Sequence, residues 1–213
     1  MPDALIWGAS GGIGSALVRV LKQAGWRVFA AARDVATVPA EADHAYAFDA
    51  ANPTSISQVE ILVAHETEGL DLVVYAAGDL RAELLKKQSA DDWSAVLDAN
   101  LNGAFLAASK SLYILKPDGH MFFMGAYIDH VTLPKMGAYA VAKAGLAVLV
   151  EVLRKENRKQ RFSLVRPGAV DTAFWEAAPF KKPANIKPPE AVATAILAHF
   201  DAGQNTDLDL PTE

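Results

Sequence analysis

A tyrosine and a lysine four residues apart, Tyr139 and Lys143, are the side chains of this sequence whose types and spacing best suit acid–base chemistry. On a helix, residues at this spacing share one face, with Cβ atoms about 5–6 Å apart. A free phenol has a pKa of ~10, and a nearby ammonium is expected to lower that pKa by roughly one to three units. The pair therefore predicts a tyrosine that acts as a general acid or base. The same spacing also occurs on helices whose ring packs while the ammonium is solvated.

Two kinds of segment alternate along the chain: short apolar runs and longer stretches with helical periodicity. This alternation is typical of repeated βαβ units, which build a parallel sheet with helices on both faces. The apolar runs predict strands at residues 4–7, 27–31, 44–48, 72–75, 120–124, 162–165 and 206–210. The periodic stretches predict helices near residues 12–24, 54–67, 89–98, 100–115, 138–159 and 189–202. We therefore expect an α/β fold with a doubly wound parallel sheet of about seven strands.

The composition bounds the number of domains and the class of partner. The chain has 213 residues, of which 52% are hydrophobic, so it is long enough for one well-buried domain, residues 1–213, and short for two. Its net charge is −5 and its basic residues are scattered, which argues against nucleic acid or an anionic membrane as the partner. A small molecule is the expected partner.

No feature of the sequence predicts a metal site, a membrane span or export. Cysteine is absent, and the five histidines show no close ligand spacing. No apolar run reaches the ~18 residues that a membrane helix needs. The N-terminus shows no signal-peptide features, so we expect a cytoplasmic protein.

A glycine-rich turn, Gly8-Ala9-Ser10-Gly11-Gly12-Ile13-Gly14, joins the first predicted strand to the first predicted helix. Glycines allow a tight turn and a close approach of backbone N–H groups, and the helix N-terminus adds partial positive charge. These features suit the pyrophosphate of a dinucleotide. We therefore predict that Gly8, Ser10, Gly12, Ile13 and Gly14 bind one. The spacing differs from the commoner Gly-x-Gly-x-x-Gly, and such a turn also occurs without a ligand.

The end of the second predicted strand, Ala32-Arg33-Asp34, bears on which dinucleotide is bound. Dinucleotide-binding folds that use NAD place a carboxylate here for the ribose 2′-hydroxyl, whereas an arginine accommodates the 2′-phosphate of NADP. Ala32 leaves room and Arg33 supplies charge, which favours NADP(H). Asp34 lies one position further and keeps NAD(H) open, and Arg33 could also be a solvated loop charge.

The order of several motifs resembles the short-chain dehydrogenase/reductase family over about residues 4–200. The motifs that carry the resemblance are Gly8-x-x-x-Gly12-x-Gly14, Asp49, Ala76-Ala77-Gly78, Asn100, Tyr139-x-x-x-Lys143 and Arg166-Pro167-Gly168-Ala169-Val170-Asp171-Thr172. The resemblance implies one NAD(P)-binding Rossmann-type domain. It also implies a homodimer or homotetramer formed through the helices near 100–115 and 138–159, which carry apolar positions on more than one face.

The resemblance implies roles for individual residues. Tyr139 would exchange a proton with the substrate oxygen, Lys143 would lower the phenol pKa and bind the nicotinamide ribose, and Asn100 would hold a water of the proton relay. An asparagine in a helix can instead cap or kink it. The other implied cofactor contacts are Asp49 and Ala50 at the adenine, Ala76, Ala77 and Gly78 along the adenosine, and Pro167, Gly168, Val170 and Thr172 around the nicotinamide. Each of these could also be ordinary turn chemistry.

One position departs from the family pattern. Members usually carry an active-site serine about thirteen residues before the tyrosine, and here that position is Ala126. Tyr127 or His130 could take over the role, although both could equally pack or face solvent. Losing one oxyanion donor typically costs about 10²–10³ in kcat, so a slow or specialised reductase survives the loss.

The segment 174–189, rich in proline and lysine, is either a substrate lid or a surface connection. Its aromatic residues Phe174, Trp175 and Phe180 could wall a substrate site or anchor the connection. The modest length of the segment suggests an open site.

These observations predict an NADP(H)-dependent oxidoreductase that transfers a hydride to or from a small carbonyl or alcohol substrate. Tyr139, Lys143 and Asn100 favour this activity. Ala126 favours the alternative, a catalytically impaired NAD(P)-binding sensor or scaffold. An epimerase or dehydratase that uses the same tyrosine is a third possibility, because related folds reuse the pair.

Overall fold

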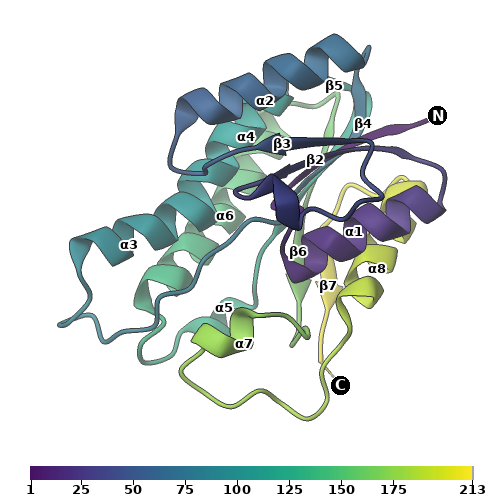
Figure 1. Ribbon diagram of the computed structural model, residues 1–213. Coiled ribbons are helices and arrows are strands. Elements are labelled where there is room, and N and C mark those ends of the chain that lie inside the picture. The colour runs from purple at the N-terminus through teal and green to yellow at the C-terminus, as the bar shows by residue number, and fades with distance from the viewer. Residues whose placement is uncertain (213) are drawn as a thin grey trace.

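The computed structural model describes residues 1–212, which form a seven-stranded sheet (Figure 1). Every strand pairing is parallel, and the strand order is β3-β2-β1-β4-β5-β6-β7. The strands are β1 (Asp3–Trp7), β2 (Arg27–Ala32), β3 (His44–Ala47), β4 (Leu70–Tyr75), β5 (Leu115–Met124), β6 (Arg161–Pro167) and β7 (Leu208–Leu210). The order reverses between β1 and β4, because β2 and β3 extend the sheet on one side of β1 and β4 to β7 extend it on the other.

Helices cover both faces of the sheet (Figure 1). On one face lie α2 (Pro53–Glu66), α4 (Gly103–Ser111) and α6 (Gly137–Glu156). On the other lie α1 (Gly12–Gln23) and α8 (Pro189–Asp201). The expected α/β fold with a doubly wound parallel sheet is confirmed. Across residues 1–212, none of the helices combines the length and the apolar character that crossing a membrane requires. The cytoplasmic location stays a prediction.

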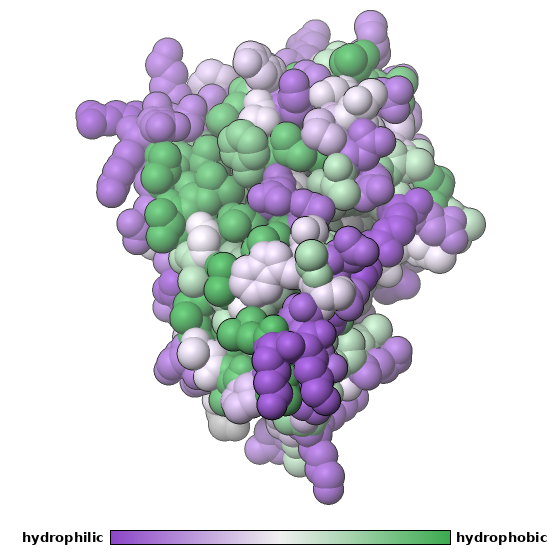
Figure 2. All heavy atoms as spheres, turned by 90° about the vertical axis from the view of Figure 1, so that its left-hand side faces the viewer, coloured by the Kyte–Doolittle hydropathy of each residue, from purple (hydrophilic) through white to green (hydrophobic). Residues whose placement is uncertain are grey.

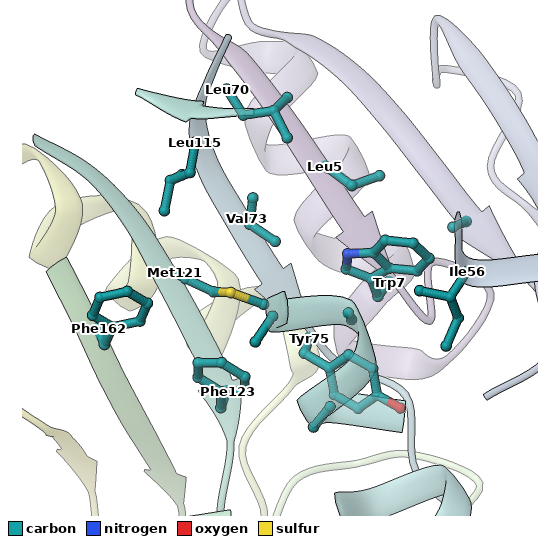
Figure 3. Close-up of a cluster of buried hydrophobic side chains, with 14 of the residues drawn as sticks. Leu5, Trp7, Ile56, Leu70, Val73, Tyr75, Leu115, Met121, Phe123 and Phe162 are labelled. Atoms are coloured by element: carbon teal, nitrogen blue, oxygen red, sulfur yellow. The ribbon is translucent and has the colours of Figure 1, made fainter. Parts of the chain in front are cut away.

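Large aromatic side chains fill the core between the sheet and α2, α4 and α6 (Figure 3). Trp7 is fully buried, meets Phe48 edge-on with ring centroids 5.1 Å apart, and donates its N–H to Ser111 Oγ at 3.4 Å. The buried Tyr75 donates its hydroxyl to the Ala99 carbonyl at 2.8 Å. Both polar groups are thus satisfied inside the core.

The predicted strands and long helices are present, and the differences lie at their ends and in short elements. The helix expected near 100–115 is a π-helical turn, η2 (Asp98–Asn102), followed by α4. β5 begins at Leu115, earlier than expected, and its register with β4 shifts between Leu70 and Leu72. The helix expected near 89–98 is present as α3 (Ala90–Leu97), and the elements that were not predicted are η1 (Val35–Thr37), α5 (Ile128–Val131) and α7 (Phe174–Ala177). Those of three or four residues are too short to show a periodic pattern.

Arginines hold the last strand against β6. Arg166 binds Asp209 at 2.6 Å and Asp207 at 2.8 Å, and Arg154 of α6 also binds Asp207. Just beyond β6, the Gly168 N–H donates to the Leu210 carbonyl at 2.7 Å, and the Ala169 N–H donates to Thr212 Oγ1 at 2.7 Å. The turn that follows β6 is therefore held by residues 207–212.

The turn between β1 and α1 is so tight that two of its positions require glycine. Gly8 has φ +87°, and a Cβ there would lie 2.4 Å from the Ala77 nitrogen. A Cβ on Gly14 would lie 2.1 Å from the Gly8 carbonyl oxygen. Gly11 differs, because it has φ −74° and its Cβ would meet Gly8 only at an ordinary 3.5 Å.

The two close neighbours Gly14 and Gly11 give a matched pair for testing this turn. We expect Gly14→Ala to lower stability by about 1–3 kcal/mol, because the added methyl collides with rigid backbone. For a chain of this size that corresponds to a fall in Tm of at least about 2–4 °C. Gly11→Ala should melt close to the wild type. Thermal unfolding followed by circular dichroism, without added ligand, measures both, and a Gly14→Ala protein as stable as Gly11→Ala would contradict the assigned contact.

Candidate functional site

A cleft of about 660 Å³ opens at the carboxyl end of the sheet, beside the reversal of strand order between β1 and β4. Open α/β sheets bind their ligands at this place. The predicted site residues that line the cleft are Gly12, Ile13, Ala76, Ala77, Gly78, Asn100, Tyr139, Lys143, Pro167, Gly168, Val170 and Thr172. Those outside its lining are Gly8, Ser10, Gly14, Arg33, Asp49 and Ala50.

Tyr139 and Lys143 lie on consecutive turns of α6, as their spacing predicted. The Lys143 ammonium sits over the Tyr139 ring, 5.3 Å from its centroid, and donates to the carbonyl oxygen of Met124 at 2.7 Å. Lys143 is 4% exposed, whereas Tyr139 is half-buried and packs against Phe174 with ring centroids 5.6 Å apart. The pair therefore forms one unit on the cleft wall.

Burial dominates the proton affinity of both groups. It lowers the pKa of Lys143 to about 8 and raises the pKa of Tyr139 above the ordinary phenol value. The expected lowering of the phenol pKa by the neighbouring ammonium is thus wrong for the chain itself. The cost of removing a phenolate from water in the cleft outweighs its attraction to the ammonium. The ammonium lies over the ring and is hydrogen-bonded to the Met124 carbonyl. At neutral pH the phenol keeps its proton.

Asn100 is fully buried in the π-helical turn η2. Its amide nitrogen donates to the carbonyls of Asp79 at 2.7 Å and Val96 at 2.8 Å. Its Oδ1 has no hydrogen-bond partner within residues 1–212, and a Cβ on Gly78 would come within 2.9 Å of it. An orphaned buried acceptor on a cleft wall is a position where a bound water or ligand donor is expected.

The glycine-rich turn leaves backbone donors open toward the cleft. α1 begins at Gly12, and its N-cap, Gly11, has no side chain that could occupy the first amides of the helix. A Cβ on Gly12 would lie 2.5 Å from the Cγ2 of Thr172, so the turn and the segment after β6 approach each other here. Ser10 is exposed. The geometry provides a helix N-terminus that can receive an anion.

The polar residues after β2 and β3 take different roles. Arg33 is exposed, whereas Asp34 caps η1 by accepting from the Ala36 N–H at 3.0 Å. Asp49 is exposed, and its Oδ1 accepts from the Ala51 N–H at 3.0 Å. One oxygen of each carboxylate is therefore already engaged by backbone, while the Arg33 guanidinium points to solvent.

The position of the expected serine is apolar. Ala126 is 8% exposed and lines the cleft next to Tyr127 and His130. The Tyr127 hydroxyl is directed toward β7, where burial and then the carboxylate of Asp209 raise its pKa. His130 lies at the exposed end of α5, with its ring 5.2 Å from that of Tyr127.

The segment 174–189 both walls the cleft and anchors itself. Phe174, Trp175 and Phe180 all line the cleft. Trp175 also donates its N–H to the Val170 carbonyl at 2.8 Å, and Val170 forms a parallel bridge with Lys187. The sequence left open whether this segment walls the cleft or anchors the connection, and its aromatic side chains do both.

Several residues of the cleft were not predicted from the sequence, Met124 and Thr212 among them. The Met124 carbonyl orients Lys143. The residue type at position 124 does not indicate this contact, because the acceptor belongs to the backbone. Thr212 lines the cleft by folding back over Gly168, which only the pairing of β6 with β7 reveals.

Comparison with known proteins connects this geometry to a family. The family model for short chain dehydrogenases matches residues 3–182. A 3-oxoacyl-[acyl-carrier-protein] reductase of Vibrio cholerae is 28% identical over 184 residues, covering 82% of this chain and 75% of the relative. A 2,3-dihydro-2,3-dihydroxybenzoate dehydrogenase of Bacillus subtilis is 30% identical over 182 residues, covering 79% of this chain and 70% of the relative.

Solved structures agree with the sequence comparison. An alcohol dehydrogenase of the archaeon Thermococcus sibiricus, complexed with 5-hydroxy-NADP, superposes with a TM-score of 0.91 at 26% identity and covers 100% of this chain and 97% of its own. A short chain dehydrogenase of Burkholderia cenocepacia in complex with NADP gives 0.84 at 25% identity, covering 99% and 96%. The family match over most of the chain, the fold and the cleft show together that this protein belongs to the short-chain dehydrogenase family.

Proposed function

We propose that this protein is an NADP(H)-dependent oxidoreductase that transfers a hydride to or from a small carbonyl or alcohol substrate, with Tyr139 as its acid/base. The observation that carries the proposal is the pairing of Tyr139 with Lys143 on the wall of a cleft that the glycine-rich turn also lines. The reductase and dehydrogenase names of the relatives support it.

The residues present fit a bound dinucleotide. The first amides of α1 can donate to its pyrophosphate, and Gly12 and Gly78 keep the cleft wall clear of side chains. Pro167, Gly168, Val170 and Thr172 line the same cleft, where the nicotinamide would sit against the turn after β6. When bound, the cofactor supplies or accepts the hydride.

Tyr139 holds the proton that the reductive direction needs. Because burial raises its pKa, the phenol is protonated at neutral pH and can donate to the substrate oxygen as the carbonyl carbon is reduced. Lys143, with a pKa of about 8, is mainly an ammonium at neutral pH and stabilises the phenolate left behind. The unpartnered Oδ1 of Asn100 is suited to hold a water that returns a proton toward Lys143.

The strand end after β2 supports NADP(H) over NAD(H). Asp34 is engaged in capping η1, which weakens its candidacy as the ribose ligand, and Arg33 is exposed beside it. Both solved structures named above contain NADP-type ligands. A guanidinium at this position can bind the 2′-phosphate bidentately.

A dinucleotide-binding sensor or scaffold is the second candidate, and the buried apolar position Ala126 favours it. A site that offers few polar groups to a substrate could bind the cofactor without turning a substrate over. An epimerase or dehydratase remains a third alternative on the same pair of residues.

The face formed by α4 and α6 suits a homodimer or homotetramer. Phe105 of α4 and Val141, Val148 and Val152 of α6 are between 40% and 62% exposed. Figure 2, which faces the left-hand side of Figure 1, shows hydrophobic side chains gathered on that face of the molecule. Exposed apolar patches of this kind mark contact surfaces, so we assign this face to self-association.

Replacing Tyr139 tests the assigned chemistry. We expect Tyr139→Phe to lower the rate of NADPH oxidation with aldehydes, ketones or quinones by about 10²–10⁴-fold, because the acid is gone. NADPH binding, followed by its fluorescence, should persist. Unchanged turnover would refute the role of Tyr139. Cofactor binding without turnover of any substrate would support the sensor, and product formation without net cofactor consumption would support an epimerase or dehydratase.

Arg33 and Asp34 form a matched pair for cofactor preference. We expect Arg33→Ala to weaken NADPH binding by about ten- to a hundredfold, the size of a lost charge-assisted hydrogen bond, and to leave NADH binding nearly unchanged. Asp34→Ala should affect neither cofactor strongly. Titration of both variants with both cofactors measures this, and a selective loss of NADH binding in Asp34→Ala would reverse the assignment.

The assigned contact face is tested by placing a charge on it. Light scattering should show a dimer or tetramer for the wild type and smaller species for Val148→Glu, because burying an unpaired carboxylate is costly. Ile61→Glu is the control, since Ile61 of α2 is similarly exposed outside this face. A wild-type monomer at high concentration would contradict the assignment.

A further inference from the structure

We propose that Phe174 is a positioning residue for the acid/base Tyr139: its ring, held by Trp175, fixes the orientation of the phenol and keeps water away from it. This inference rests on the function proposed above and adds to it a residue from outside α6. Three observations carry it: what touches the Tyr139 ring, what holds Phe174, and what sets the proton affinity of the phenol.

The orientation of the Tyr139 side chain depends on packing. The bond from Lys143 to Met124 fixes the part of α6 from which Tyr139 projects, but it does not involve the Tyr139 side chain. The Tyr139 hydroxyl forms no hydrogen bond within residues 1–212. Long side chains on helices commonly adopt two χ1 rotamers, so contacts with the ring must select one of them.

Two groups lie against the Tyr139 ring. The Lys143 Nζ is 5.3 Å from the ring centroid and comes from the next turn of the same helix. The Phe174 ring comes from the segment beyond β6, with its centroid 5.6 Å from that of Tyr139 and the two planes at 51°. Phe174 therefore supplies the contact that ties the phenol to a second part of the protein.

Phe174 is itself held in place. Trp175 meets its ring edge-on with centroids 5.5 Å apart, and Phe180 meets Trp175 edge-on at 5.9 Å. The Trp175 N–H donates to the Val170 carbonyl at 2.8 Å, and Val170 forms a parallel bridge with Lys187 at the far end of the segment. The Phe174 ring therefore occupies a fixed place on the cleft wall.

The same contact shields the phenol from water. Burial raises the pKa of Tyr139, and Phe174 is one of the groups that bury it. A phenolate is stabilised by water, so removing the Phe174 ring should lower this pKa toward the ordinary phenol value of ~10.

The charged and titratable groups around the phenol stay the same when residue 174 is changed. Those that line the cleft are Asp79, Tyr127, His130 and Lys143. Glu176 of α7 is exposed, and Asp171 is paired with Lys182 at 2.6 Å. A change in the pH dependence of turnover in a Phe174 variant therefore reports the exposure of the phenol to water.

Stepwise truncation of Phe174 tests the inference, with NADPH and the aldehyde, ketone or quinone that the wild type reduces fastest. Phe174→Ala should lower kcat by about 10- to 100-fold, the cost of misplacing a reacting group by about 1 Å. Phe174→Leu, which keeps part of the contact, should fall between this variant and the wild type. NADPH binding should stay close to that of the wild type in both, because Phe174 packs on the acid.

The pH dependence of the reverse reaction separates positioning from the loss of a wall. Oxidation of the corresponding alcohol by NADP⁺ needs the phenolate, so its kcat/KM rises with pH up to the pKa of Tyr139. In Phe174→Ala this rise should end at a pH lower by about one unit or more, and in Phe174→Leu the change should be smaller. A structural defect alone would lower the rate at every pH without moving that point.

Phe180→Ala is the matched control, because Phe180 also lines the cleft, yet within residues 1–212 its ring packs on Trp175 and not on Tyr139. It should change KM more than kcat and leave the pH profile as in the wild type. A wild-type kcat and pH profile in Phe174→Ala, or an equal pH change in Phe180→Ala, would overturn the inference. If Phe174→Ala does not fold, Phe174→Leu decides, and wild-type behaviour of that variant would overturn the inference.

The outcomes distinguish this inference from the proposed function. Turnover that Tyr139→Phe abolishes and Phe174→Ala leaves unchanged would sink the inference and leave the oxidoreductase intact. Binding of NADPH without reduction of any carbonyl compound would sink both.

Discussion

A buried ammonium bonded to the last carbonyl of a central strand is the interaction on which the site depends. Lys143 is almost fully enclosed, and its bond to Met124 ties α6 to the end of β5. Removing a charge from water is costly unless the charge is paired or hydrogen-bonded, so this contact fixes the side chain in one place. Tyr139, one turn earlier on the same helix, is positioned by the same contact. The geometry of the pair thus follows from one backbone acceptor on the sheet.

Much of the architecture was predictable because its causes are local. A parallel sheet covered on both faces needs strands that are apolar throughout, and such runs stand out between amphipathic helices. All seven expected strands are present. The glycine-rich turn could also be predicted from the sequence, because positions such as Gly8 and Gly14 tolerate no side chain and must be glycine. The proximity of Tyr139 and Lys143 could be predicted from their helical spacing alone.

The rest depended on contacts between distant segments. The sign of the Tyr139 pKa shift is set by burial, and Phe174, from a distant segment, packs on its ring, which spacing on α6 does not reveal. Asp34 is adjacent to Arg33 in sequence, yet a cap on a three-residue helix decides what its carboxylate does. Tyr127 follows Ala126 directly, but its hydroxyl is directed by β7, about eighty residues further along the chain. In each case the sequence gives the residue, but a contact formed only in the folded protein decides what its side chain does.

The attachment of residues 207–212 to β6 and to the turn beyond it has a consequence for biosynthesis. These residues leave the ribosome after every other part of the cleft, yet they hold Gly168 and Ala169 in place. Because domains form as their chain emerges, the nascent protein can assemble β1 to β6 before the wall near Gly168 is fixed. The wall of the cleft near Gly168 is therefore fixed only after residues 207–212 have emerged, later than the other parts of the cleft.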